Sequence, residues 1–170
     1  KPYQFARWSP DGQKIGLVRA GWIWIADADG GNRTDLGVAV SIYSGVVIDF
    51  HPDTAAQEII YTADALMAVS YAPASLGSTR VVADYHQYTG EPSASAALTG
   101  AGEVKRLVAR IGHDLYAVTP GSGDRLYEAG GVCSPCISPD GAYLANNIGT
   151  HTGMTIRDWD GSNGRQIDAG

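Results

Sequence analysis

The chain has 170 residues, 44% of them hydrophobic, which is enough for one globular domain with a core. The formal net charge is −6 and the twelve Lys and Arg residues are scattered. A nucleic-acid surface gathers basic residues on one face, so we expect no nucleic-acid partner. No apolar run reaches the roughly 18 residues that cross a membrane, so we also expect no membrane span.

The stretch 8–36 predicts two hairpins in succession. Ser9–Gly12 has the sequence Ser-Pro-Asp-Gly, which suits a tight turn because proline presets φ, aspartate bonds its own backbone and glycine accepts a positive φ. Strand-like apolar runs follow at 15–18 and 22–26, and the polar stretch 27–32 makes a second turn. This stretch therefore predicts one four-stranded antiparallel unit.

The same unit returns near the C-terminus. Ser-Pro-Asp-Gly recurs from Ser138, which lies 129 residues, or three times 43, after Ser9. A weaker copy, Phe-His-Pro-Asp, lies at 50–53, and 104–128 keeps the second half of a further unit. A period near 43 with four strands in each period is typical of β-propeller blades.

We therefore expect an all-β fold, a β-propeller of four-stranded antiparallel blades. The period places four units at about 1–43, 44–88, 89–130 and 131–170. The middle of the chain is less regular. It contains a strand-like run at 80–85, followed by 90–97, where the composition indicates an exposed loop or a short helix.

Four phrases, ARWSPDGQKIGLV, WIWIADADGGN, CISPDGAYLA and IRDWDGSNG, resemble the TolB-like family of β-propeller repeats. The resemblance covers roughly 1–62 and 104–170, and it implies a periplasmic or secreted protein. The N-terminus carries no signal-peptide pattern, so we expect either a removed leader or a longer chain. Propellers of this family usually have six or seven blades. Four units imply a sector, a small closed ring or a fragment of a longer chain.

No catalytic signature is visible: the sequence lacks a nucleophile elbow, a P-loop, an HExxH motif and a dinucleotide-binding glycine pattern. We therefore expect no catalytic residue and no cofactor. The function that we expect is a non-catalytic module for protein–protein interaction or scaffolding in a larger assembly, with a protein or further blades as partner. The alternative is the propeller domain of a carbohydrate-binding or polysaccharide-active enzyme, or the gating propeller of a peptidase.

Three polar residues are candidates for ligand binding. His151 and Asn147 lie in a polar linker and could be presented at a propeller face, and His86 lies between Tyr85 and Tyr88 in a possible carbohydrate platform. The alternative is that the histidines lie on surface loops and that the aromatic rings pack between blades.

The sequences Asp27-x-Asp29-Gly30 and Asp158-x-Asp160-Gly161 resemble the start of a calcium loop. An EF-hand needs glycine at the sixth position and glutamate at the twelfth. The first copy has Asn32 and Val38 there. We therefore interpret both stretches as hairpin turns and expect no metal site.

Cys133 and Cys136 form a CxxC pair. Ile137 excludes c-type haem attachment, which needs histidine at that position, and zinc would need further soft ligands. A local disulfide and two small buried thiols both remain open. Positions i and i+3 of a straight strand face opposite ways, so a disulfide needs a bend, which Pro135 could supply.

A propeller avoids exposed sheet edges by closing its ring, with each blade packed on the next. Since four units are few for closure in this family, we expect the first and last units each to leave an apolar face without a partner in this chain. The residues expected on these faces are Trp8, Trp22 and Trp24 at one end, and Ile137, Leu144, Ile156 and Trp159 at the other.

If the protein is periplasmic or secreted, as the resemblance implies, Cys133 and Cys136 should be bonded to each other. Alkylation followed by intact-mass measurement, with and without reductant, tests this. Two freely alkylated thiols in non-reduced material would remove the local support for an oxidising compartment.

Overall fold

The computed structural model describes residues 3–40, 48–63, 65–83, 98–101, 106–111, 114–119, 124–129, 132–138, 140–148 and 152–168. These residues form sixteen strands and two short 3₁₀ turns, η1 (Thr54–Ala56) and η2 (Pro73–Ser75). No helix in the described part of the chain is long and apolar enough to cross a membrane. The strands are β1 (Tyr3–Trp8), β2 (Lys14–Arg19), β3 (Trp22–Asp27), β4 (Thr34–Ala39), β5 (Ile48–Phe50), β6 (Glu58–Thr62), β7 (Leu66–Ser70), β8 (Thr79–Ala83), β9 (Leu98–Ala101), β10 (Arg106–Ile111), β11 (Asp114–Thr119), β12 (Asp124–Ala129), β13 (Val132–Ile137), β14 (Tyr143–Ile148), β15 (Gly153–Asp158) and β16 (Arg165–Asp168).

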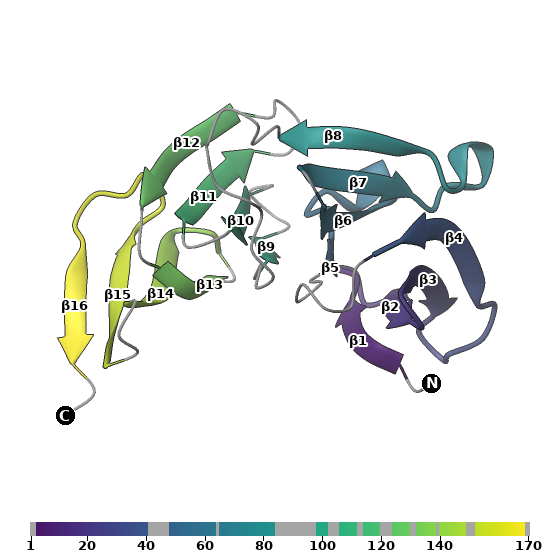
Figure 1. Cartoon of the computed structure of the whole chain (residues 1–170), viewed down its shortest axis with the longest axis horizontal. Helices are drawn as coiled ribbons and strands as arrows, with labels where there is room; N and C mark the ends of the chain where they lie inside the picture. The colour runs from purple at the N-terminus through teal and green to yellow at the C-terminus, as the bar shows by residue number, and fades with distance from the viewer. Residues whose placement is uncertain are drawn as a thin grey trace.

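The strands form four antiparallel sheets of four strands, and the chain runs through each sheet in order. The sheets follow one another along an arch, with the N- and C-termini at its opposite ends (Figure 1). The first strands of successive sheets are neighbours: β5 contacts β1 and β9, and β13 contacts β9. The predicted architecture of four-stranded antiparallel blades is confirmed.

The two Ser-Pro-Asp-Gly turns have the same hydrogen bonds. Asp11 Oδ1 accepts from Ser9 Oγ (2.6 Å) and from the Gln13 amide (3.0 Å), and Asp140 Oδ1 accepts from Ser138 Oγ (2.6 Å) and from the Ala142 amide (3.0 Å). These bonds, the serine hydroxyl first, lower the pKa of both carboxyls. The turn glycines have φ of 69° and 71°, the left-handed region that the sequence predicts.

The weaker copy at the start of the second sheet is a turn of different construction. The His51 amide donates to Glu58 O (2.9 Å), as the Ser9 amide donates to Lys14 O (2.9 Å), so His51 occupies the position of Ser9. Its Nδ1 accepts from the Asp53 amide (3.0 Å). The 3₁₀ turn η1 follows Asp53 at the place where the other two turns have a glycine. His51 is buried, and burial lowers its pKa.

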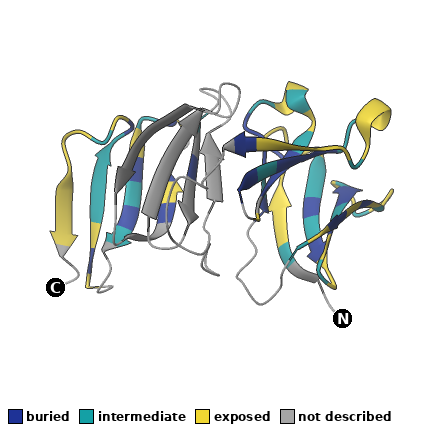
Figure 2. Ribbon diagram, turned by 45° about the horizontal axis from the view of Figure 1, so that its top comes forward, coloured by how far each residue is buried: buried dark blue, intermediate teal, exposed yellow. Residues whose placement is uncertain are grey.

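The first two sheets share one hydrophobic core, and Figure 2 shows buried segments on strands of both sheets. We call the side of a sheet that looks toward the next sheet in the chain its front face, and the opposite side its back face. The front face of the first sheet meets the back face of the second. The core residues are Val18, Ile23, Ile25, Leu36 and Val38 from the first sheet, and Ile48, Phe50, Ile59, Tyr61 and Val69 from the second.

The second sheet is buried on both faces. Ile59 and Ile60 are adjacent in β6 and point to opposite faces, yet both are 0% exposed, and the same holds for Ala68 and Val69 in β7. In the first sheet, by contrast, the large buried side chains lie on the front face.

The last sheet packs on the third through an arginine. Arg106 of β10 donates to Gly141 O (2.8 Å), and its guanidinium lies 5.0 Å from the centroid of the Trp159 ring. Leu144 is fully buried, and Ile137 is nearly so. The back face of the last sheet is therefore covered.

In the middle of the chain, the structure agrees only in part with the strands predicted from the sequence. The predicted strand at 80–85 corresponds to β8, and β9 lies in a stretch to which the sequence assigned no strand. The expected loop or short helix at 90–97 lies outside the described residues.

Gly16 lies where the first sheet packs closely on the second. A Cβ at this position would lie 3.1 Å from Ile59 Cδ1, 3.2 Å from Phe50 Cε2 and 3.3 Å from Ile48 Cδ1. Gly16→Val should therefore overpack the junction and lower the free energy of unfolding by about 1–3 kcal/mol in urea titrations. Gly164→Val is the matched control, since no atom lies within 4 Å of a Cβ there. Equal losses in the two variants would contradict this account.

The buried His51 predicts a pH dependence of stability. Its pKa is lowered in the folded state, so below the unfolded value of about 6.5 the unfolded chain binds more protons and the folded state loses stability. The urea concentration at the unfolding midpoint of the wild type should decrease when the pH is lowered from 8 to 5. His51→Asn keeps an acceptor for the Asp53 amide but does not titrate, so its midpoint should fall less. A parallel decline in both proteins would assign the effect to other groups.

Candidate functional site

The described residues form a cleft between the first two sheets and exposed apolar faces at the two ends of the arch, and we consider both as candidate sites. The cleft has a volume of about 370 Å³. Its described lining is Lys14, Ile25, Ala26, Asp27, Asn32 and Thr34 from the first sheet and its turn, and Gln57, Tyr71, Pro73 and Leu76 from the second.

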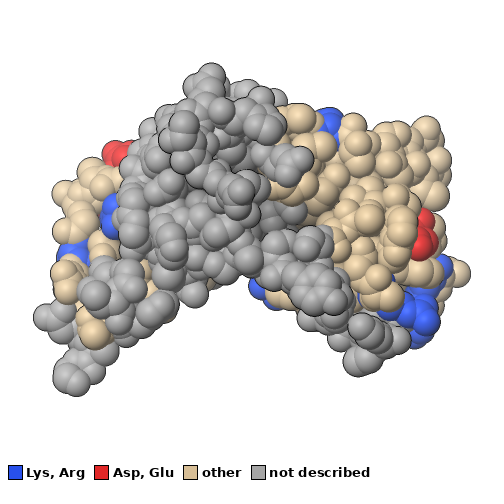
Figure 3. Space-filling model, in the orientation of Figure 1, with Lys and Arg blue, Asp and Glu red and all other residues tan. Residues whose placement is uncertain are grey.

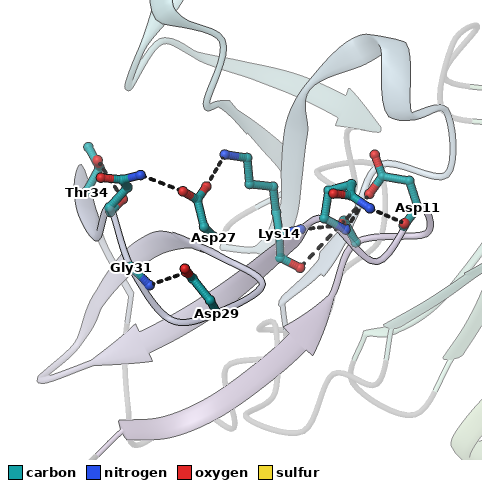
Figure 4. A network of polar contacts seen from close by, with 9 residues as sticks. Asp11, Lys14, Asp27, Asp29, Gly31 and Thr34 are labelled. Carbon is teal, nitrogen blue, oxygen red and sulfur yellow. Dashed lines mark hydrogen bonds and ion pairs between the residues drawn. The ribbon is translucent and has the colours of Figure 1, made fainter.

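The polar end of the cleft is the turn after β3 (Figure 4). The carboxylate of Asp27 forms an ion pair with Lys14 Nζ and accepts from Asn32 Nδ2 (2.6 Å), and Asp29 Oδ1 accepts from the Gly31 amide (2.7 Å). The hydrogen bonds from Lys14 first, and then from Asn32, lower the pKa of Asp27. Both aspartates thus serve the turn, which agrees with the hairpin-turn interpretation of this motif.

This cleft is suited to neutral polar contacts. Lys14 and Asp27 neutralise each other, and the other described lining residues carry no charge. General acid–base or nucleophilic chemistry needs a nucleophile within hydrogen-bond reach of a base. The described lining does not provide such a pair.

The back face of the first sheet carries Trp8, Ile15, Leu17, Trp22 and Trp24. Strand register places them on one side, because Trp8 pairs with Ile15 and Leu17 pairs with Trp24. Trp8 is 59% exposed and Trp22 43%. The guanidinium of Arg19 lies 5.5 Å from the centroid of the Trp24 ring. Trp8 and Trp22 are therefore exposed as predicted, whereas Trp24, also expected on this face, is half-buried.

Trp8 has counterparts in other sheets, which show how unusual its exposure is. The residue directly before the turn is Phe50 in the second sheet and Ile137 in the last. Phe50 is 2% exposed because the first sheet covers it, and Ile137 is 6% exposed against the third sheet. Trp8 occupies an interior position of the fold that nothing in the described chain covers.

The uncovered face at the other end is the front face of the last sheet. It carries Tyr143, Met154, Ile156 and Ile167, which β14–β16 pairing places on one side. Tyr143, Met154 and Ile167 are 49%, 42% and 48% exposed. Ile156 was expected here and is half-buried.

Three other residues expected on that free face are not on it. Ile137, Leu144 and Trp159 are buried, so this part of the prediction was wrong. The reason is strand alternation: Leu144 points to the back face and packs toward the third sheet, whereas its neighbour Tyr143 points to the front. Arg106 covers Trp159.

Of the predicted ligand-binding residues, Asn147 alone lies in the described part of the chain. It is half-buried and pairs with Met154, which places it on the front face of the last sheet. His86 and His151 lie outside the described residues, so their roles stay predictions. The neighbouring Asn146 is 1% exposed and donates from Nδ2 to Asn147 O (3.1 Å).

The cysteine pair lies on β13, at a bulge. Cys133 pairs with Asn147 and Cys136 with Ala145, so two residues of β13 lie opposite one residue of β14 between these pairs. Cys136 is exposed and its thiol is free in this structure. The Cys133 side chain lies outside the described residues, and the disulfide stays a prediction.

Sequence reasoning missed the cleft. Lys14, Gln57 and Tyr71 come from two sheets, and their proximity depends on how those sheets stack. The one signal in the sequence was the Asp27–Asn32 motif, which forms the polar end.

No family model and no curated protein matches this sequence. Among solved structures, dihydro-heme d1 dehydrogenase NirN in complex with DHE aligns with a TM-score of 0.68 and 17% identity, over 98% of this chain and 37% of that one. A nidogen/laminin complex aligns at 0.64 and 16% identity, over 98% and 63%. The β-propeller domain of Cps50 (Swd1) from Myceliophteria thermophila aligns at 0.60 and 15% identity, over 90% and 50%.

The chain therefore spans less than two thirds of the length of each of these structures. Likeness at this level of identity concerns the fold alone. Together with the four sheets, it shows that the chain has a β-propeller fold and forms a sector of one.

Proposed function

We propose that this propeller sector is a non-catalytic protein-interaction or scaffold module in a larger assembly. The observation that carries the proposal is the back face of the first sheet. There, Trp8 is 59% exposed at a position where Phe50 of the second sheet is 2% exposed.

The chemistry of this face suits a protein partner. Burying apolar surface contributes roughly 25 cal/mol per Å², and tryptophan is enriched among the residues that dominate binding at protein interfaces. A sheet face is broad and rigid, whereas small ligands prefer concave pockets. Figure 3 shows both basic and acidic atoms at the right of the molecule, among larger areas without charge.

The neighbours give fold-level support. The nidogen structure is a complex with another protein, and the NirN structure holds a small molecule. Those roles belong to those proteins. The uncovered tryptophans favour the first kind of role for this chain.

Two narrower proposals rest on the sequence. The Ser-Pro-Asp-Gly and Asp-x-Asp-Gly turns support membership of the TolB-like repeat family, and that resemblance supports a periplasmic or secreted location. A role in carbohydrate or peptide chemistry would need His86 and His151 to converge with aromatic rings, and the described lining of the cleft contributes Tyr71 as its aromatic residue.

Photo-crosslinking in the producing organism tests the interaction role. We expect p-benzoylphenylalanine in place of Trp22 to form adducts with a defined protein, with crosslinked peptides that map to the back face. The matched control is the same substitution at Val81, which is 54% exposed on β8, away from both end faces. Adduct yields at position 22 that do not exceed those at position 81 would overturn the proposal.

A further inference from the structure

The described part of the chain leaves two apolar sheet faces uncovered, and they are of different kinds. One is the back face of the first sheet, and the other is the front face of the last sheet. Inside the chain, the junction between the first two sheets joins a front face to a back face. One end of the arch therefore exposes a back face and the other end exposes a front face. These are the two kinds of face that pack together at the junction inside the chain.

Strand pairing shows that the front faces of the first and last sheets are equivalent. Gly16 pairs with Ile25 in the first sheet, as Ala145 pairs with Ile156 in the last. The turns that follow also match, because Asp27 accepts from Asn32 Nδ2 (2.6 Å) as Asp158 accepts from Asn163 Nδ2 (2.6 Å).

The equivalent side chains differ in burial. Ile23 and Leu36 are 0% and 2% exposed because the second sheet covers them. Their counterparts, Met154 and Ile167, are 42% and 48% exposed. The front face of the last sheet is thus apolar like that of an interior blade, but no described residue covers Met154 or Ile167.

We propose that a second copy of this chain supplies that blade. The front face of the last sheet packs on the back face of the first sheet of the other copy, and the reverse contact forms at the other end. Two copies then close one twofold-symmetric ring from their four sheets each. This inference rests on the proposed function and names its partner.

Two observations favour a second copy in this arrangement. A front-to-back contact is heterologous, and heterologous contacts close into a ring when the rotation fits. The chain covers 50% of the Swd1 propeller domain, 63% of the nidogen structure and 37% of the NirN structure, so two such sectors come near the length of one propeller. A back-to-back pair would cover Trp8 and Trp22 but leave Met154 and Ile167 in water.

The test is solution mass by light scattering, with one charge placed on each face. The wild type should have twice the 17.8 kDa mass of one chain. Trp8→Glu and Ile167→Glu should each be monomeric, since each damages both junctions of the ring. Val81→Glu is the matched control and should keep the doubled mass. The replaced side chains are 59%, 48% and 54% exposed, so far-UV circular dichroism spectra that match the wild type should show that all three variants fold.

Mixing the two end-face variants provides the sharper test. Trp8→Glu keeps an intact front face and Ile167→Glu keeps an intact back face, so an equimolar mixture should regain dimers through one undamaged junction. A back-to-back dimer predicts instead that Ile167→Glu stays dimeric and that mixing rescues nothing. Either of those results, a monomeric wild type or larger oligomers would overturn the proposal.

Crosslinking from position 22 separates this inference from the proposed function. Adducts with peptides of the same chain, from its last sheet, support both. Adducts with a different protein overturn the second copy and leave the interaction role standing. Absence of adducts above the Val81 control overturns both.

Discussion

A β-sheet that is apolar on both faces is stable only when both faces are covered, and this constraint governs the whole molecule. The second sheet meets it: adjacent residues Ile59 and Ile60 point to opposite faces, and both are fully buried. The end sheets have the same kind of sequence but one neighbour each. Apolar surface that stays in water does not contribute the roughly 25 cal/mol per Å² of stabilisation that its burial would give. The exposure of Trp8, Trp22, Met154 and Ile167 therefore follows from position along the arch and not from a different kind of sheet.

This constraint also explains why the ends, and not the cleft, carry the functional proposal. In the cleft, Lys14 and Asp27 satisfy each other and Asn32 completes the turn, so its polar end is already stabilised without a ligand. At the ends, exposed apolar side chains, which a partner would bury, lie together on rigid sheets. A binding surface of this kind comes from the repeat architecture itself and needs no specialised loop.

Local chemistry made most of the fold predictable. The turns at Ser9–Gly12 and 138–141 follow from an aspartate that bonds a serine hydroxyl and a backbone amide, which is a sequence-local event. The assignment of Ile137, Leu144 and Trp159 to a free face failed for a physical reason. Alternation tells which residues share a face, but which face meets the neighbour depends on sheet stacking. The cleft escaped prediction for the same reason, as its walls belong to two sheets.

The order of the strands has a consequence for how the chain acquires its structure. Every ladder among the described strands joins strands that follow each other in sequence, so backbone pairing requires the closure of short loops alone. Contacts of long sequence separation are confined to the surfaces between sheets. Chains with this distribution can nucleate in any unit and propagate to its neighbours, as linear repeat arrays do. Cooperativity in this molecule is therefore carried by contacts at the junctions. Two examples are the side chains of the second sheet that pack closely on Gly16 and the hydrogen bond from Arg106 to Gly141 O.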